Sequence, residues 1–118
     1  MEVSSFPDLG LDQQTRLLGL ARQSIAQGLH SGQPRECPAG DFSGALARPG
    51  ASFVTLRRHG ELRGCVGSLE AARPLAQDVA TAAFNAAFRD RRFPRLSESE
   101  LAEVRIEISV LSPMVPLR

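Results

Sequence analysis

Three residue types are missing from this chain of 118 residues, which contains no lysine, no tryptophan and no tyrosine. Because all 14 of its Lys and Arg residues are arginines, the chain has neither a lysine that could form a Schiff base nor the lysine of a Walker A phosphate loop. The aromatic surface available for stacking on bases is limited to six phenylalanines. These absences exclude both lysine-dependent site types and disfavour single-stranded nucleic-acid binding.

Charge of one sign and long apolar runs are also scarce. The formal net charge is +1, which gives no broad electrostatic attraction to nucleic acid or to anionic membranes. The longest stretch without Asp, Glu or Arg, residues 23–34, is polar and contains glycine, so no segment is expected to span a bilayer. The N-terminus has neither a basic region nor an apolar core, so no secretory signal is visible. With 42% hydrophobic and 23% charged residues, the composition is that of a soluble globular protein, which we expect in the cytoplasm.

Cysteine and histidine are too few and too far apart to build a local metal site. The chain has two of each, in the order His30, Cys37, His59 and Cys65, and no pair of them has the spacing of zinc ligands. No metal is therefore predicted. Cys37 falls in a segment rich in Gly and Pro, and it is expected to be an unpaired surface thiol in a flexible loop.

Hydrophobic periodicity predicts a mixture of helices and strands. A helix capped by Asp12 is expected over residues 12–29, followed by a loop over 30–50 of a length that is usually functional or mobile. The other expected elements are a hairpin of residues 51–58 and 61–68, a helix over 74–88, a short turn capped by Ser97 and Glu100, and a strand over 104–111. This order indicates an α+β fold, with a mainly antiparallel sheet, a central β-hairpin and packed helices, in a single domain of residues 1–118.

The hairpin turn at His59-Gly60 sets the expected register of the two strands. The pairs that follow from this turn are Arg58 with Glu61, Leu56 with Arg63, and Val54 with Cys65. Because side chains alternate along a strand, Arg63 and Cys65 would then share one partly apolar face with the two aliphatic residues. The sequence therefore predicts a thiol and a guanidinium group side by side.

Two polar features in the second half of the chain have competing interpretations. The helix over 74–88 carries a narrow polar stripe of Asp78, Thr81 and Asn85, which is either a solvent-facing edge, the favoured interpretation, or the wall of a cleft. The arginine-rich segment 89–95 is either a nucleic-acid patch or a solvated loop whose shape is fixed by Asp90 and Arg92. The net charge near zero favours the loop.

Six consecutive residues carry a family resemblance. Leu62-Arg63-Gly64-Cys65-Val66-Gly67 resembles the signature of the AMMECR domain family, known in prokaryotes as AmmeMemoRadiSam system protein A, which usually has Ile where this chain has Val66. Segments that follow the same family order are residues 50–56, 68–70, 73–75, 87–90, 92–94 and 106–113. The resemblance covers residues 50–117 closely and the first predicted helix loosely.

The resemblance implies an α+β fold of two unequal subdomains, with the signature lining a cleft between them. It also implies partners, because members in prokaryotes are often encoded with a Memo-like protein and a radical SAM protein. It implies no particular reaction or cofactor. Members of the family continue beyond the length of this chain, which is therefore expected to be an AMMECR-like domain without the family's C-terminal part.

The signature supplies the candidate site residues. Arg63, Gly64, Cys65 and Gly67 are predicted to bind a substrate, since small residues let a ligand approach the backbone closely. Cys65 is also the candidate catalytic residue, as a nucleophilic or redox thiol that Arg63 activates.

Each reactive side chain of the signature has an alternative role. Cys65 is otherwise a small buried hydrophobic residue, which is what free cysteine most often is. Arg63 either binds a carboxylate or phosphate in a bidentate fork or pairs with an acid such as Glu61 or Glu107, and the sequence favours neither. In the folded protein we expect Cys65 to be alkylated measurably, but more slowly than Cys37.

The resulting functional hypothesis is a component of a multi-protein modification system that binds a small ligand or a partner's reactive group at residues 62–67. The alternatives are a non-enzymatic adaptor, in which the signature glycines serve packing, and single-stranded nucleic-acid binding, which the shortage of aromatic residues disfavours.

Self-association is also predicted. The strand over 104–111 carries an apolar stripe, and the two long helices can cover only one face of the sheet. A sheet edge and part of the second face would then stay open in this chain alone.

Overall fold

The computed structural model describes residues 2–4 and 9–111. Their helices and strands are β1 (Glu2–Ser4), α1 (Leu11–Ser31), β2 (Ala51–Arg58), β3 (Glu61–Gly67), α2 (Leu75–Phe88), α3 (Glu98–Leu101) and β4 (Val104–Leu111). The strands form one four-stranded sheet in the order β1-β4-β2-β3. β2 pairs antiparallel with β3 and with β4, and β1 pairs parallel with β4. The predicted α+β fold with a mainly antiparallel sheet is confirmed.

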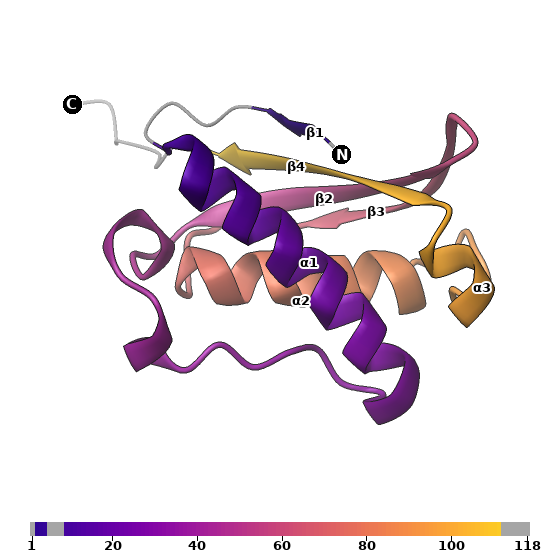
Figure 1. The fold of residues 1–118 in the computed structure, drawn as a ribbon, viewed down its shortest axis with the longest axis horizontal. Coiled ribbons are helices and arrows are strands. Elements are labelled where there is room, and N and C mark those ends of the chain that lie inside the picture. The colour runs from indigo at the N-terminus through magenta and orange to yellow at the C-terminus, as the bar shows by residue number, and fades with distance from the viewer. Residues whose placement is uncertain (1, 5–8, 112–118) are drawn as a thin grey trace.

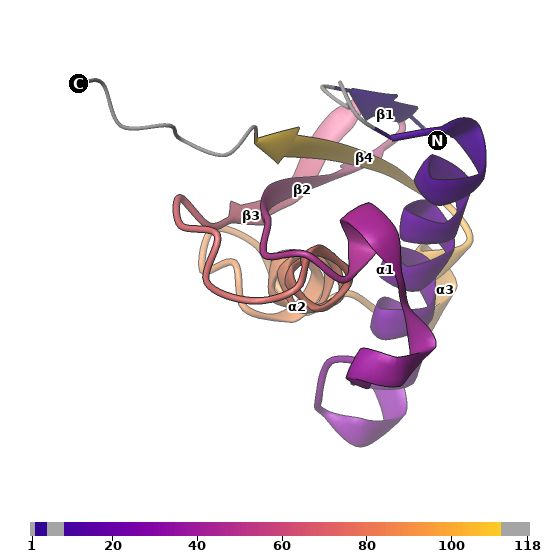
Figure 2. The same cartoon turned by 90° about the vertical axis from the view of Figure 1, so that its left-hand side faces the viewer.

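The helices lie together on one face of the sheet (Figure 1; Figure 2). α2 packs under β2 and β3, and α1 crosses α2 and reaches β4. Among the described residues no helix covers the opposite face, which we call the open face. The largest apolar side chains that are fully buried between the layers are Leu17, Ile25, Val54, Leu56, Val79, Ile106 and Ile108. No helix of the described residues is long and apolar enough to cross a membrane.

α1 starts one residue earlier than predicted, at Leu11, and Asp12 is not its cap. The N-cap position is Gly10, whose N–H donates to the side-chain oxygen of Gln13 at 3.3 Å. Asp12 lies instead in the first turn, where its charge is favourable beside the helix dipole. The helix ends at Gly32, which adopts the left-handed conformation with φ of 72°.

The loop after α1 is tied to both long helices. It contains two short 3-10 turns, η1 (Ala39–Asp41) and η2 (Gly44–Leu46). The Arg35 N–H donates to the Ser24 hydroxyl at 3.0 Å, and the Cys37 N–H donates to the Gln77 side chain at 2.8 Å. Cys37 is a free thiol as predicted, but it is half-buried against the core, so the prediction of a surface position is wrong.

The hairpin turn lies where the sequence predicts it, but the strand register beyond the turn differs from the predicted one. His59 and Gly60 both have positive φ, 53° and 82°, as a tight two-residue turn requires. Arg58 pairs with Glu61, but β3 then contains a bulge, after which Gly64 rather than Arg63 lies opposite Leu56. A bulge adds one residue to one strand, so every later pair shifts by one position.

The polar stripe of α2 is not a solvent-facing edge at its first residue. Asp78 is 1% exposed, although Thr81 and Asn85 are half-buried on the same helix. Its carboxylate accepts hydrogen bonds from the hydroxyls of Ser52 at 2.6 Å and Ser68 at 3.0 Å. Burial of a carboxylate is tolerated here because it is fully hydrogen-bonded.

Candidate functional site

β3, which carries the signature, is an outer strand of the sheet. β2 lies along one of its edges (Figure 1), and Asp90, just after α2, contacts the other edge through the Cys65 N–H. The bulge turns the signature side chains in different directions, so the prediction that Arg63 and Cys65 share a face with Val54 and Leu56 is wrong. Both aliphatic residues are fully buried on the helix side.

Cys65 lies on the open face of the sheet. It stands opposite Thr55, and its Sγ atom is 3.3 Å from the Thr55 hydroxyl. Thr55 is flanked on its other side by Glu107 of β4. The thiol is half-buried, and it is free.

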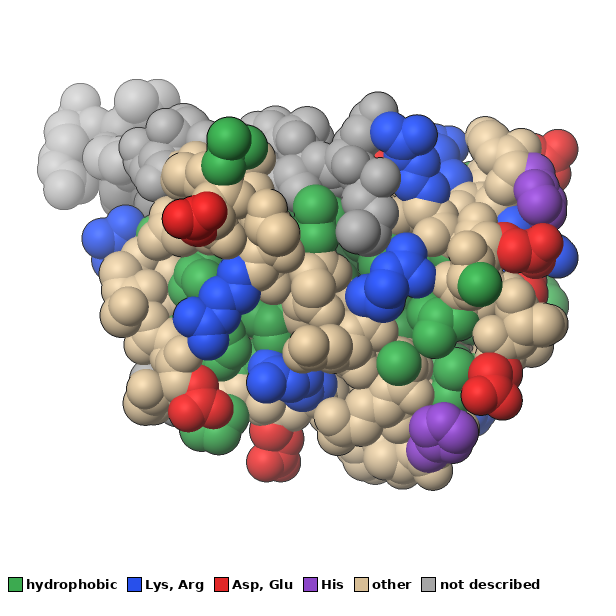
Figure 3. Space-filling model, in the orientation of Figure 1, with side chains coloured by type: hydrophobic (Ala, Val, Ile, Leu, Met, Phe, Trp, Pro, Cys, Tyr) green, Lys and Arg blue, Asp and Glu red, His purple; other side chains and the backbone are tan. Residues whose placement is uncertain are grey.

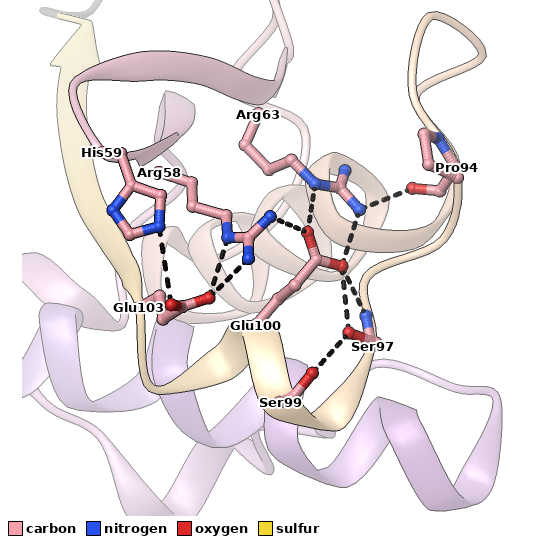
Figure 4. Close-up of polar contacts among 8 residues, drawn as sticks. All are labelled: Arg58, His59, Arg63, Pro94, Ser97, Ser99, Glu100 and Glu103. Atoms are coloured by element: carbon pink, nitrogen blue, oxygen red, sulfur yellow. Dashed lines mark hydrogen bonds and ion pairs between the residues drawn. The ribbon is translucent and has the colours of Figure 1, made fainter.

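The Arg63 side chain points toward Glu100 of α3 (Figure 4). Its guanidinium group forms a bidentate contact with Glu100, with Nε–Oε2 of 2.9 Å and Nη2–Oε1 of 3.1 Å, and Nη2 also donates to the Pro94 carbonyl. Neither Glu61 nor Glu107, the acids considered from the sequence, is its partner. With 8% of its surface exposed and its fork occupied, Arg63 is held inside the fold.

Glu100 is the centre of this polar cluster. Besides Arg63 it receives the Ser97 N–H at 3.0 Å, the helix-capping contact predicted for that turn, and the Arg58 guanidinium lies 3.5 Å away. Hydrogen bonding from Arg63 is the main reason that the pKa of Glu100 falls to about 2. The cluster joins the turn end of the hairpin to α3, as Figure 4 shows.

A second ion pair holds the outer edge of β3 at Cys65. The Cys65 N–H donates to Asp90 Oδ2 at 3.0 Å, and Arg92 Nη2 donates to the Cys65 carbonyl at 3.4 Å. Arg92 and Asp90 are 2.7 Å apart, and the hydrogen bond from Arg92 is the main cause of a pKa of Asp90 far below its usual range. The interpretation that Asp90 and Arg92 fix the shape of this loop is confirmed.

The two signature glycines are both in tight contacts. A Cβ at Gly64 would overlap with the backbone oxygen of Ala86 in α2, and a Cβ at Gly67 would overlap with the Phe53 ring on the open face. Both positions were predicted to let a ligand approach the backbone. The space beside each is filled by the protein's own atoms, so the contacts favour packing for these two residues.

A buried cluster at the end of β3 was missed by the sequence interpretation. Ser68, the residue after the signature, bonds to Asp78, which also binds Ser52 and the Nε atom of Arg73 at 3.0 Å. The signal available was an acid within a helix that is otherwise almost entirely apolar. This cluster fixes the C-terminal end of the signature strand against α2.

The described residues around Cys65 offer a nucleophile but no histidine that could serve as its base. His59 is at the hairpin turn beside Glu103, and His30 is exposed near the end of α1. Among these residues no cluster of His, Cys, Asp and Glu could hold a metal ion. Thr55, the only hydrogen-bonding side chain on the thiol, cannot act as a strong base. The arrangement presents the Cys65 thiol and the Thr55 hydroxyl on the open face, with the Arg92 guanidinium at the adjoining strand edge.

Comparisons with known proteins agree with the signature. The chain is 44% identical over 105 residues to a protein of Aeropyrum pernix, covering 86% of this chain and 44% of that protein. It is 35% identical over 112 residues to a protein of Methanothermobacter thermautotrophicus, covering 95% and 58%. The crystal structure of an uncharacterised protein from Pyrococcus horikoshii matches with a TM-score of 0.76 and 35% identity, over 83% of this chain and 50% of that one.

This chain therefore spans about half the length of the relatives that it matches. The family model described as AMMECR1 matches residues 18–118, which include all of α2, β2, β3 and β4 and most of α1. Together with the signature on β3, these matches show that the chain belongs to the AMMECR1 family.

Proposed function

We propose that this protein is a component of a multi-protein modification system and that it binds a small ligand or a partner's reactive group at the Cys65 surface. The observation that carries the proposal is the position of the thiol. Of the signature side chains, Cys65 alone is both reactive and turned to the open face, where the described residues place no helix. Memo-like and radical SAM proteins are the partners that the family resemblance suggests.

The surroundings of Cys65 support binding better than independent catalysis. The strand edge is fixed by Asp90 and Arg92, so the thiol has a defined position before any ligand arrives. The Arg92 guanidinium, whose Nη2 donates to the Cys65 carbonyl at 3.4 Å, places a positive charge at the same strand edge. A reaction at the thiol would also need a proton acceptor, which we expect a partner or a further part of a longer protein to supply.

A non-enzymatic adaptor is the second candidate. It is favoured by the roles of Arg63 and Gly64, which are engaged with Glu100 and with the α2 backbone. In that case the signature would serve the architecture of a docking domain and Cys65 would be a half-buried packing residue. Nucleic-acid binding has less support, because Arg89, Arg92 and Arg95 lie over the rings of Phe84, Phe93 and Phe88.

Graded alkylation separates the first two candidates. Two single-cysteine variants, Cys37→Ser and Cys65→Ser, are treated with iodoacetamide with and without a Memo-like protein, the partner suggested by the family resemblance. Burial raises the pKa of the Cys37 thiol, so we now expect Cys65 to react faster than Cys37 in the folded protein, the reverse of the order expected from sequence. The partner should slow the alkylation of Cys65 and leave that of Cys37 unchanged.

Two results would decide against a binding thiol. If Cys65 stays unmodified until the protein unfolds, the thiol is structural. If the partner binds without protecting Cys65, the adaptor function is supported and the interface lies elsewhere. Thr55→Val serves as a conservative check, because it keeps the side-chain shape and removes only the hydroxyl that contacts the thiol.

A further inference from the structure

A hollow of about 290 Å³ lies between α1 and the loop that follows it, and no residue of the sheet contributes to it. Its lining residues are Arg16, Gly19, Leu20, Gln23, Arg35 and Phe42. On the face of the molecule formed by α1, arginine side chains border hydrophobic side chains that reach the surface (Figure 3). The hollow is therefore a site separate from Cys65, which lies on the open face of the sheet.

The wall that α1 contributes is one helical stripe. Arg16, Gly19, Leu20 and Gln23 follow the spacing of one helix face. Gly19 is unusual there, because glycine inside a helix is less favourable than alanine. Gly28 of the same helix has a packing reason, since its Cβ would stand 2.7 Å from the rings of Phe84 and Phe88, whereas a Cβ at Gly19 would meet nothing within 4 Å. Gly19 keeps the hollow open.

Arg16 is positioned at the hollow without an acidic partner. Its guanidinium carbon is 4.4 Å from the centre of the Phe42 ring, and Nη2 donates to the Asp41 carbonyl at 2.8 Å. Glu36 and Asp41 are the acids close to the hollow in sequence, and both are exposed. Among the described residues neither carboxylate forms an ion pair with Arg16 or Arg35.

Arg35 faces the same hollow from a part of the loop that is fixed. Its backbone N–H binds Ser24 of α1, and its carbonyl accepts a hydrogen bond from Gln77 of α2 at 3.1 Å. Its guanidinium makes one weak contact, from Nη1 to the Cys37 sulfur at 3.8 Å. Two guanidinium groups without carboxylate partners thus line a hollow formed before any ligand binds.

We propose that this hollow binds a small organic anion, with its carboxylate or phosphate held by Arg16 and Arg35. Planar guanidinium groups bind both oxyanions through paired hydrogen bonds. Leu20 and Phe42, which are almost fully buried, provide an apolar floor for the body of the ligand. The volume is at the lower end of ligand pockets, which selects a small molecule.

The test uses phenyl phosphate, benzoate and uncharged benzamide, each titrated into the whole chain and followed by calorimetry and by amide chemical shifts. At least one anion should bind and benzamide should not; which of the two anions binds distinguishes a phosphate from a carboxylate ligand. Arg35→Gln should weaken binding at least about tenfold, as expected for a lost charge-assisted hydrogen bond. Gly19→Leu should abolish binding by filling the hollow, while Gly19→Ala should retain it.

Arg57→Gln is the control, because Arg57 lies on β2 and pairs with Glu107. If it weakens anion binding as much as Arg35→Gln, the attraction is general to this arginine-rich chain and the proposal is overturned. The absence of binding by both anions at millimolar concentration, or unchanged binding in Gly19→Leu, overturns it as well. Melting temperatures of the variants, expected to be no lower than that of the parent for both Gly19 substitutions, show that the fold is intact.

Discussion

Gly64 lies so close to Ala86 that a β-carbon at residue 64 would overlap with the Ala86 carbonyl oxygen. That oxygen belongs to the backbone of α2, so it cannot move aside without displacing the helix. β3 therefore meets α2 at a separation that only glycine permits. The contact also accounts for the bulge, because the shifted register brings Gly64, and not the long side chain of Arg63, opposite Leu56 on the helix side.

We expect Gly64→Ala to destabilise the protein by at least about 3 kcal/mol, since the added methyl group forces two backbone segments apart. The free energy of unfolding, measured by chemical denaturation, checks this. Gly19→Ala is the matched control, because its β-carbon enters open space and the helix gains roughly 0.5–1 kcal/mol. A loss below about 1 kcal/mol in Gly64→Ala would mean that β3 and α2 are not tightly packed there.

Arg63→Ala tests whether the signature arginine serves the fold or a ligand. The substitution leaves Glu100, whose side chain is only 14% exposed, without its main partner and the Pro94 carbonyl without a donor, so we expect a loss of about 3 kcal/mol in stability. Arg57→Ala, which removes a more exposed pair with Glu107, should cost less than about 1 kcal/mol. Unchanged melting in Arg63→Ala, together with weaker ligand binding, would instead make Arg63 a binding residue.

The sequence was sufficient for the two long helices and for β2, β3 and β4, but it predicted neither β1 nor the directions of the signature side chains. The turn at His59-Gly60 is a local property of two residues, and it was predicted correctly. The bulge that follows depends on the contact of Gly64 with α2, which lies more than twenty residues further along the chain. A register counted outward from the turn could not include it.

The spacing of residues in the sequence also could not predict which polar side chains pair with each other. Arg63 and Glu100 are separated by 37 positions, and Ser52 and Asp78 by 26. Their pairing follows from the way α2 and α3 are placed under the sheet, which alternation and helix periodicity do not specify. The contacts of Asp90 and Arg92 with each other were predictable because those residues are two positions apart.

Self-association stays a prediction of this chain. The helices bury Val104, Ile106 and Ile108, so the open face, rather than this stripe, is the surface expected to associate. Leu62 lies on β3 opposite Arg57 and is 37% exposed. In sedimentation velocity at micromolar concentration we expect dimers or larger species, and Leu62→Lys should shift them toward the monomer by placing a charge in the contact.

Leu69→Lys is the matched control, because Leu69 is 80% exposed and lies outside the strands. It should leave the distribution of species unchanged. A single monomeric species for the unsubstituted chain, with a cooperative melt, would contradict the prediction, since it would show that the open face needs no cover.

The loss of folding stability at acidic pH should depend on Glu100. Its pKa is about 2 in the folded protein against 4.5 for the free side chain, chiefly because Arg63 hydrogen-bonds to the ionised form. A carboxyl group whose pKa is depressed by folding stabilises the protein fully above its unfolded pKa, and this contribution is lost as the pH falls through the folded value. We therefore expect the stability difference between the parent and Glu100→Gln to be constant above about pH 5.5, roughly one unit above the unfolded pKa, and to shrink toward pH 2.

The measurement is a series of urea denaturations from pH 7 to pH 2 on both proteins, and we expect the difference lost over this range to be about 1–2 kcal/mol. Glu98→Gln is the control, because it removes an exposed carboxylate of α3 that forms no ion pair among the described residues. The stability curve of Glu98→Gln should run parallel to that of the parent throughout.

The pKa of Asp90 is lowered as well, chiefly by the hydrogen bond from Arg92, so the parent loses stability in acid through both carboxylates. Only the comparison with Glu100→Gln isolates the contribution of the Arg63 cluster. A difference that stays constant down to pH 2 would mean that Arg63 does not hold Glu100 in its ionised form, and the bidentate contact would then contribute nothing to folding.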